Sequence, residues 1–329
     1  MKAAFIRQPG PAESIVYGDL PLPLRSPQQL LIQVTAAAVN PIDTYIRGGA
    51  VAMELPQPFV VGCDFAGVVV EAPNDSAFHA GQRVWGSNQG ILGRQGTCCE
   101  TIAVDPCWVY PTPDEVADDA AAAAALVGIT AHLGLFRDAR LQAGEIVLVQ
   151  GGTGGVGNSV LQMAKAVGAK VMATAGTDEK VAACLEAGAD WAINYHAEDF
   201  LDQLRAQAPD GVDVWWETSR NPNLDGAVAA LKRRGRIILM AGRDAKPPFP
   251  VGPFYVKECR LLGFVMFLAT AAEQQRAAED INRWLVDGRL STTIGRTFTL
   301  DQTAVAHRLQ EDSTIHGTAT LQGKIVIRP

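Results

Sequence analysis

Cys63 and Asp64 stand side by side at the head of the apolar stretch 65–70. A thiolate and a carboxylate can both bind zinc, but a catalytic zinc needs three protein ligands. The six cysteines of the chain show no C-x-x-C spacing that would supply them from one segment. The pair therefore indicates either part of a metal site or the strand of such a site without its metal.

The glycine-rich turn 151–157 is a second candidate, because it contains the pattern G-x-G-x-x-G. It follows the apolar run 145–150, typical of a buried parallel strand, and it opens a helix-period stretch that ends at Gly168. In this context the missing Cβ atoms let backbone N–H groups approach a pyrophosphate at a helix N-terminus. The turn predicts a dinucleotide site at Gly152, Thr153, Gly154, Gly155, Val156 and Gly157.

The end of the next strand distinguishes the two nicotinamide cofactors. An NAD site usually places Asp or Glu about 20 residues after the glycine turn, but here Ala175 and Gly176 end the strand. Lys180 begins the next helix and Tyr195 closes the third strand, so both are placed to hold a 2′-phosphate. A surface lysine and a half-buried strand tyrosine are the alternatives. Together with the absent acid, these residues favour NADPH.

Composition excludes several classes of function. The chain has 329 residues, of which 48% are apolar and 19% charged, so a folded core is expected, in two domains as a prior. A net charge of -7 argues against nucleic acid or an anionic membrane as the main partner. The run 120–127 is too short to span a membrane and no signal peptide is recognised, so a cytoplasmic location is expected. The basic cluster 232–236 is expected at a solvated helix end.

The elements that position these residues change character along the chain. Residues 1–110 hold short strand-like runs between turn residues, which predicts a β-rich domain. A helix begins at 120–125, and from 145 onward strands and helices alternate, which predicts a parallel, doubly wound sheet. The expected strands are 145–150, 170–174, 191–194, 212–217, 236–241, 261–268 and 324–327, and the expected helices after 150 end near 167, 187, 208, 231, 287 and 311.

Four stretches carry a resemblance to a known family: AVNPIDTYIRGG at 38–49, TAGTDEK at 174–180, INY at 193–195, and IHG with GK near the end. With the glycine turn, they make the sequence resemble the medium-chain dehydrogenase/reductase superfamily, and within it the quinone oxidoreductases related to zeta-crystallin. The resemblance implies a GroES-like catalytic domain from 1–120 and 266–329. It also implies an NADPH-binding Rossmann domain at 121–265, an active site in the cleft between them, and a homodimer.

This resemblance also bears on Cys63 and Asp64. In the zinc alcohol dehydrogenases of the superfamily, the corresponding strand begins Gly-His-Glu, and its His binds the catalytic zinc with two cysteines from other segments. Cys63 takes the His place, Asp64 the Glu place, and the cysteine places fall on Asn40 and near Leu126. Since three ligands are needed, the resemblance implies a zinc-independent enzyme, with Cys63 as a small buried residue and Asp64 as a hydrogen-bonding partner.

Residue roles follow from the same resemblance. Asn40, Asp43 and Tyr45 would line the cleft near the nicotinamide, with Tyr45 as donor to the substrate oxygen and Asn40 as a second donor. Tyr45 packing the cleft wall is the alternative. Thr130, expected to open the linking helix, would meet the nicotinamide ribose. The other implied cofactor contacts are Thr218, Ala241, Gly242, Arg243, Phe264 and Phe267, with plain core packing as the alternative for the two phenylalanines.

The resulting prediction is NADPH-dependent reduction of a quinone without zinc. A conjugated acceptor spreads the incoming charge, so orientation and hydrogen bonds can replace a Lewis acid. The nearest alternative is an NADPH-dependent enone or alkenal reductase. An alternative of another class is a crystallin-like structural or RNA-binding protein, against which the acidic charge and the intact glycine turn argue.

Overall fold

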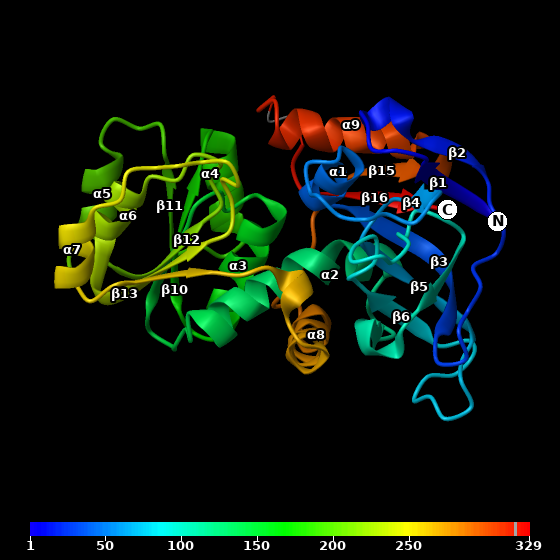
Figure 1. Ribbon diagram of the computed structural model, residues 1–329. Helices are drawn as coiled ribbons and strands as arrows, with labels where there is room; N and C mark the ends of the chain where they lie inside the picture. The colour runs from blue at the N-terminus through cyan, green and yellow to red at the C-terminus, as the bar shows by residue number, and fades with distance from the viewer. Residues whose placement is uncertain (319–320) are drawn as a thin grey trace. The chain divides into compact units, whose positions relative to one another are not determined.

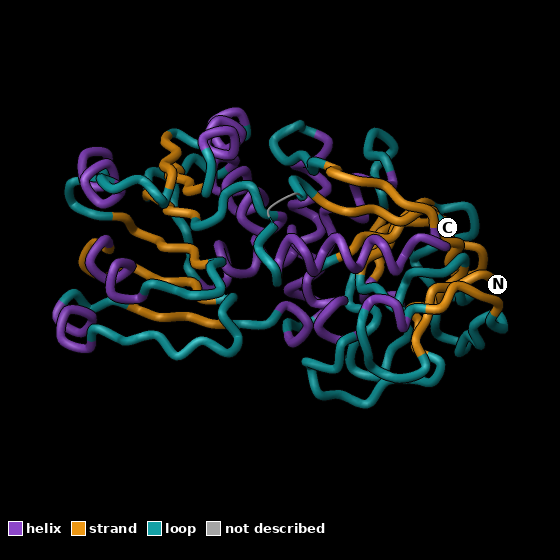
Figure 2. The backbone as a smooth tube through the Cα atoms, turned by 90° about the horizontal axis from the view of Figure 1, so that it is seen from above, coloured by secondary structure: helices purple, strands orange, loops and turns teal. Residues whose placement is uncertain are grey.

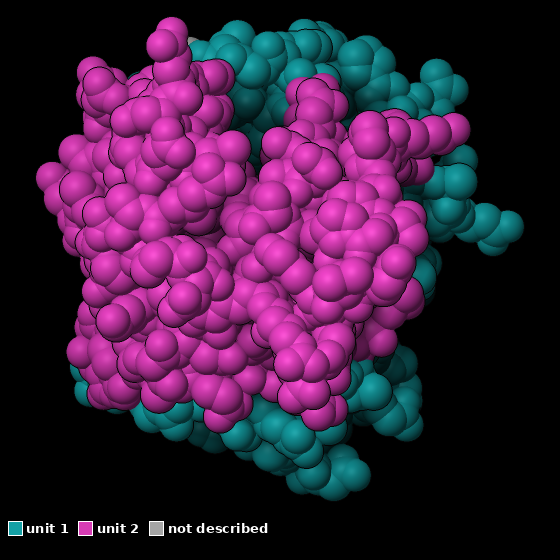
Figure 3. Space-filling model, turned by 90° about the vertical axis from the view of Figure 1, so that its left-hand side faces the viewer, with its two compact units in different colours: residues 1–126, 270–286, 291–329 teal, residues 127–269, 287–290 magenta. Residues whose placement is uncertain are grey.

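The computed structural model describes residues 1–318 and 321–329, and the chain divides into two compact units. Unit 1 comprises Met1–Leu126, Thr270–Val286 and Ser291–Pro329, and unit 2 comprises Val127–Ala269 and Asp287–Leu290 (Figure 3). The units therefore divide at 126 and 269, where the sequence predicted divisions at 120 and 265.

Unit 2 is built on one parallel sheet of six strands, drawn in green and yellow in Figure 1. Numbered by their order along the chain, the strands lie in the order 3-2-1-4-5-6, which is the doubly wound dinucleotide-binding arrangement. The strand order reverses between β9 and β12, so ligands are expected at the carboxyl ends of these two strands. Across the sheet the strands are β11 (Trp191–Asn194), β10 (Lys170–Ala175), β9 (Ile146–Val149), β12 (Val212–Glu217), β13 (Leu231–Leu239) and β14 (Arg260–Gly263).

The helices of unit 2 start and stop where local signals place them. Thr177 caps α4 by accepting a hydrogen bond from the Lys180 N–H, and Gly168 and Gly188 follow helices with positive φ angles. Figure 2 shows the strands of this unit lying between helices. The helices are α3 (Gly155–Ala166), α4 (Asp178–Glu186), α5 (Phe200–Gln207), α6 (Leu224–Ala230) and α7 (Val251–Val256).

Two segments of unit 2 differ from the sequence prediction. The basic cluster 232–236 lies inside β13 and not at a helix end, because its cations pair with distant carboxylates: Lys232 with Asp213 and Arg236 with Glu145. The strand predicted at 261–268 is also too long. Strand β14 ends at Gly263, and a 3₁₀ turn occupies Met266–Leu268.

Unit 1 contains a seven-stranded sheet and a small three-stranded sheet. Strand β3 (Leu30–Val39) is the centre of the larger sheet, because β16 pairs with its end while β5 and β7 pair along its length. Its core combines buried Phe5, Ile32, Phe65 and Val84. The other strands are β1 (Lys2–Ile6), β2 (Val16–Asp19), β4 (Phe59–Val60), β5 (Asp64–Glu71), β6 (Arg83–Gly86), β7 (Thr101–Val104), β8 (Val109–Pro111), β15 (Ile294–Thr299) and β16 (Lys324–Arg328).

Helix α1 (Pro41–Arg47) and strand β15 were not predicted from the sequence. The helix forms because the Asp43 side chain accepts the Asn40 N–H and because Pro41 occupies its first position, where a missing N–H costs nothing. Its signals are local, but they lie within a region of strand-like composition. The other helices with residues in this unit are α2 (Asp118–His132), α8 (Ala271–Val286) and α9 (Thr303–Thr314).

Helix α2 continues through a π-helical turn at Leu133–Asp138. By length and composition, the span Asp118–Asp138 could cross a membrane, but 83% of its most apolar window is buried within the protein. The alanines of 121–125 are almost fully buried, as in the core helix of a folded protein. Thr130 lies near the end of α2 and does not open it, which corrects the sequence prediction, because the helix already begins at Asp118.

Candidate functional site

The glycine turn joins the carboxyl end of β9 to the start of α3. Gly151 adopts a φ of 73°, and the N–H of Gly152 donates to the carbonyl of Thr174 at 2.9 Å. A Cβ on Gly157 would lie 2.2 Å from the Gly151 carbonyl oxygen, and one on Gly152 would lie 2.8 Å from Cys184 Sγ. The fold of the turn therefore requires glycine at both positions.

The start of α3 is open to an anion. Gly154 is its N-cap, and no side chain caps the helix among the described residues. The first N–H groups of a helix have no partner within it, and the helix dipole makes them attractive to negative charge. A Cβ on Gly154 would meet only the Gly151 carbonyl oxygen, at 3.4 Å. The residues of the turn, with Thr153, Gly155 and Val156 among them, thus fit the pyrophosphate of a dinucleotide.

Thr218 follows β12 at the point where the strand order reverses. Its hydroxyl donates to the Gln150 carbonyl oxygen at 2.5 Å, and a Cβ on Gly151 would lie 2.8 Å from it. Thr174 donates to the side chain of the same Gln150. The structure therefore places Thr218 directly beside the glycine turn, as expected for a residue of one site.

The residues predicted at the 2′-phosphate come from three consecutive segments. Gly176 follows β10, and a Cβ there would lie 2.5 Å from the Tyr195 hydroxyl. Tyr195 follows β11, is 45% exposed, and packs its ring against His196. Lys180 is half-buried in the first turn of α4. Two carboxylates are present in this turn, Asp178 and Glu179, and the Asn194 amide donates to Asp178 at 2.9 Å.

The remaining predicted cofactor contacts lie after strands β13 and β14 of the same sheet. Ala241 and Gly242 are half-buried, Gly242 with a φ of 75°, and Arg243 is exposed. Phe264 packs against the guanidinium of Arg137 and against Gly134, so part of its surface serves the core. The other residues placed here or on α2 are Phe267, half-buried in the 3₁₀ turn, and Thr130, buried near the end of α2.

In unit 1, a buried polar network surrounds the start of α1. The Asn40 side chain donates to Asp64 Oδ2 at 2.8 Å and accepts a hydrogen bond from Lys324 Nζ. Ser87 donates to the other oxygen of Asp64 at 2.6 Å. The N–H of Leu126 also donates to Asp64, at 3.3 Å. Both ends of the Asn40 amide are therefore occupied, and its side chain is fully buried.

The ionisable groups of this network are strongly perturbed. Burial raises the pKa of Asp43 to about 7, although its Oδ2 accepts the Asn40 N–H at 2.7 Å. Its Oδ1 has no hydrogen-bond partner among the described residues. Burial also raises the pKa of the Cys63 thiol and of Asp64, and it lowers the pKa of Lys324, which the neighbouring carboxylates partly offset.

The predicted catalytic residues thus occupy different environments. Asn40 already has hydrogen-bond partners for its amide N and O, which favours a positioning role over the second donor expected from the sequence. Asp43 caps α1 from the inside. Tyr45 is half-buried, and no partner of its hydroxyl is found among the described residues. Within the described residues, the Tyr45 hydroxyl is therefore without a partner and available to donate a hydrogen bond.

Sequence reasoning gave no role to Lys324 or Ser87. Lys324 was noted only as part of a family motif, although a cation at the head of the apolar strand 324–327 is itself a signal. A lysine is rarely buried unless it is paired.

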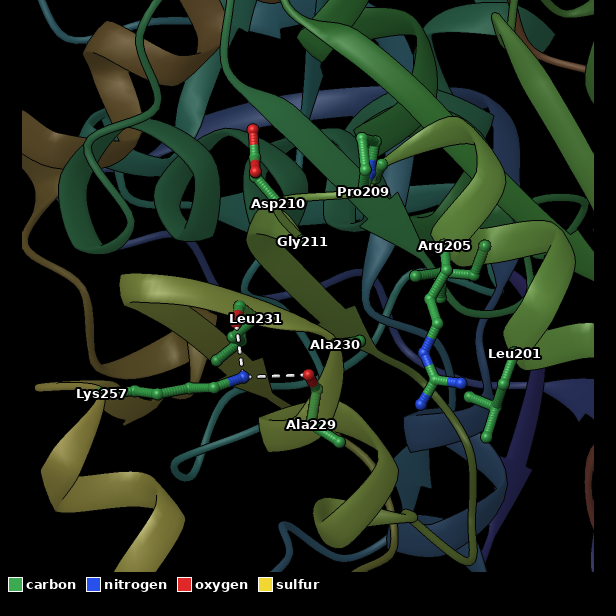
Figure 4. A pocket seen from close by; sticks show the side chains of 11 residues that line it. Leu201, Arg205, Pro209, Asp210, Gly211, Ala229, Ala230, Leu231 and Lys257 are labelled. Carbon is green, nitrogen blue, oxygen red and sulfur yellow. Dashed lines mark hydrogen bonds between the residues drawn. The ribbon is translucent and has the colours of Figure 1, made fainter.

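Unit 2 also contains a cavity of about 340 Å³, which is not part of the candidate cofactor site (Figure 4). It lies beside the starts of β12 and β13, at the opposite edge of the sheet from the glycine turn. The ammonium of Lys257 donates to the carbonyls of Ala229 at 2.9 Å and Leu231 at 2.8 Å. It thereby caps the end of α6. Because the cavity lies at the opposite edge of the sheet, it is separate from the dinucleotide site.

Comparison with known proteins agrees with this geometry. Residues 26–114 match the family of the alcohol dehydrogenase GroES-like domain, and residues 155–283 match that of the zinc-binding dehydrogenases. A mycobacterial protein solved in complex with NADPH superposes with a TM-score of 0.86 at 27% identity, and each chain is covered completely. The fold and the glycine turn define a medium-chain dehydrogenase/reductase.

Full-length relatives narrow the family further. Human quinone oxidoreductase is 32% identical over 97% of this chain and 94% of its own length. Bovine prostaglandin reductase 1 is 34% identical over 50% of this chain and 52% of its own length. The chain belongs to the quinone oxidoreductase family.

The zinc named by the second family does not fit the residues of this chain. Asn40 offers an amide already held by Asp64 and Lys324, and Leu126 offers only its main-chain N–H. Cys63 is a buried thiol with a raised pKa, whereas zinc binds thiolate. Among residues 1–318 and 321–329, no three side chains of His, Cys, Asp or Glu are grouped so as to hold a metal.

Proposed function

We propose that the chain reduces quinones with NADPH and without zinc. The observation that carries this is the uncapped start of α3 at the reversal point of the sheet, behind a turn in which Gly152 and Gly157 have no room for a side chain. Membership of the quinone oxidoreductase family supports the substrate class.

NADPH, when bound, supplies the reducing equivalents. The chain binds and orients it. The backbone N–H groups at the start of α3 hold the pyrophosphate, and Thr218 fixes the turn from the side of β12. Lys180 and Tyr195 hold the 2′-phosphate, because β10 ends at Ala175 and is followed by Gly176, so no carboxylate stands there. Ala241, Gly242, Arg243, Phe264, Phe267 and Thr130 complete the proposed cofactor contacts.

Tyr45 acts on the substrate side. Its hydroxyl donates a hydrogen bond to a quinone oxygen, and this bond strengthens as negative charge develops there. A quinone spreads that charge through its ring, so a hydrogen bond and correct orientation serve where a simple ketone would need a Lewis acid. Asn40 and Asp43 set the start of the helix that carries Tyr45.

An enone or alkenal reductase is the second candidate. The half-chain match to prostaglandin reductase 1 favours it, and the chemistry is related, since a conjugated enone also delocalises charge. The match covers only part of the chain, so quinone reduction is the function better supported.

The test is NADPH oxidation by the purified protein against a panel of quinones and enones, with no nucleic acid added. We expect kcat/KM to be about tenfold or more higher for the best quinone than for the best enone, which corresponds to about 1.4 kcal/mol of transition-state stabilisation. Faster turnover of enones would assign the second candidate. Absence of any turnover, with tight RNA binding, would support the non-enzymatic class.

We also propose that the protein forms a homodimer and that it is located in the cytoplasm. Strand β14 pairs only with β13, which leaves its outer edge unpaired in the described chain. Apolar side chains are exposed beside it, namely Val251, Tyr255, Val256, Leu261, Val265 and Leu268. All six cysteines are free thiols, as in a reducing compartment. Light scattering that gives a monomer mass, or fractionation that places the protein outside the cytoplasm, would contradict these proposals.

A further inference from the structure

Helix α1 is held at its start by a residue from the far end of the chain. Lys324, the first residue of β16, donates from Nζ to the carbonyl of Val39 at 3.0 Å and to the side-chain oxygen of Asn40. Val39 ends β3, and Asn40 is the N-cap of α1. The ammonium therefore lies at the junction between strand and helix, 285 residues away from Val39 in sequence.

The network around this ammonium is closed by one carboxylate. Asp64 accepts from the Asn40 amide, from the Ser87 hydroxyl and from the Leu126 N–H. Its own carbonyl accepts the Thr97 hydroxyl at 2.8 Å. Strands β3, β5 and β16, the segments after β6 and before β7, and helix α2 thus meet at the start of α1.

Burying the charged and polar groups of this network costs free energy. Lys324 is 7% exposed, and Asn40 and Asp64 are fully buried. Burying charged groups in such a network is often no more stabilising than apolar side chains of the same volume, because the charges lose their hydration. What such a network supplies is a defined geometry, since directional bonds fix the groups that it joins.

The geometry concerned is the orientation of a short helix. Helix α1 has only seven residues, so its formation and orientation depend on contacts with the rest of the protein. Its far end is held by the ion pair of Arg47 with Glu311. Its near end is held by Asn40, which is itself held by Lys324 and Asp64. Tyr45 lies between these two anchors.

We propose that Lys324 is a positioning residue for quinone reduction: it holds Asn40, and through Asn40 the start of α1, so that Tyr45 meets the substrate oxygen. This inference rests on the proposed role of Tyr45. Lys324 acts through Asn40 and touches neither substrate nor cofactor.

The test compares Lys324→Met with the parent and with Lys2→Met, which removes an exposed lysine paired with Asp19 in the same unit. Lys324→Met should lower kcat for quinones about tenfold or more while the Kd for NADPH stays within about twofold. Amide hydrogen exchange in 41–47 should accelerate about tenfold or more. Lys2→Met should match the parent in all three measurements.

A double-mutant cycle with Tyr45→Phe separates this role from general stabilisation. If Lys324 acts through Tyr45, the second substitution should cost less than about twofold in kcat in the Lys324→Met background. Two losses that multiply would overturn the proposal, as would a folded Lys324→Met with parental kcat or parental exchange in 41–47. If Lys324→Met does not fold, Asp64→Asn takes its place in the same cycle and decides by the same criteria. A parent that turns over no quinone refutes the proposed function, whereas the exchange measurement still decides whether Lys324 holds α1.

Discussion

His307 is expected to make the stability of unit 1 sensitive to acid. It lies on α9, is fully buried, and neither ring nitrogen has a hydrogen-bond partner among the described residues. Burial, and then the nearby guanidinium of Arg47, lower its pKa from 6.5 to about 3. The ring is therefore neutral in the folded protein at every pH above that value.

The sign and size of the effect follow from this shift. Below pH 6.5 the unfolded chain binds a proton at this histidine, and the folded chain does not until about pH 3. The contribution of His307 to the free energy of unfolding is therefore fully present above pH 6.5, and it is lost progressively as the pH falls from 6.5 towards 3. At pH 5, which lies about 1.5 pH units below 6.5, the loss of unfolding free energy is about 1.4 kcal/mol per unit, or about 2 kcal/mol in total.

The assay is urea unfolding of the parent and of His307→Gln at pH 7 and pH 5, followed by circular dichroism. Between the two pH values the variant should lose about 2 kcal/mol less than the parent, because glutamine does not titrate. His79→Gln, which changes an exposed histidine of the same unit, serves as control and should keep the parental pH dependence. An equal loss for the parent and His307→Gln would refute the reasoning.

Four further predictions concern the site. Gly157→Ala should weaken NADPH binding about tenfold or more, because the new Cβ would lie 2.2 Å from a carbonyl oxygen. The control Gly252→Ala, where a Cβ would meet open space, should leave the Kd for NADPH unchanged. Equal Kd values for the two variants would contradict this prediction. Lys180→Ala should weaken NADPH about tenfold to a hundredfold by titration and leave NADH nearly unchanged; an equal loss would exclude a phosphate contact. Tyr45→Phe should lower kcat on quinones about tenfold with little change in NADPH affinity, and parental kinetics would show that the phenol gives no charge stabilisation. Metal analysis should find no stoichiometric zinc, and one tightly bound zinc per chain would overturn the ligand argument.

Much of unit 2 could be predicted from the sequence because its signals are local. Strands β11 and β12 were predicted with the bounds that they have, since buried parallel strands are short apolar runs between turn residues. The glycine turn was readable for the same reason, because its function depends on adjacent residues that lack side chains. The basic cluster 232–236 was misassigned, since its partners, Asp213, Glu145 and Glu258, are not adjacent to it in sequence.

The sequence by itself determined the cofactor-binding turn, the absence of a carboxylate at the end of β10, and the family to which the chain belongs. Only the tertiary structure showed which groups the side chains of Asn40 and Lys324 contact. From the sequence, Asn40 was predicted only to line the cleft near the nicotinamide and to act as a second donor to the substrate oxygen. In the folded chain, β16 places an ammonium on one side of the Asn40 amide and β5 places a carboxylate on the other. Hydrogen bonds between segments hundreds of residues apart leave no periodic pattern in a single sequence, because they depend on which strands become neighbours when the sheet forms.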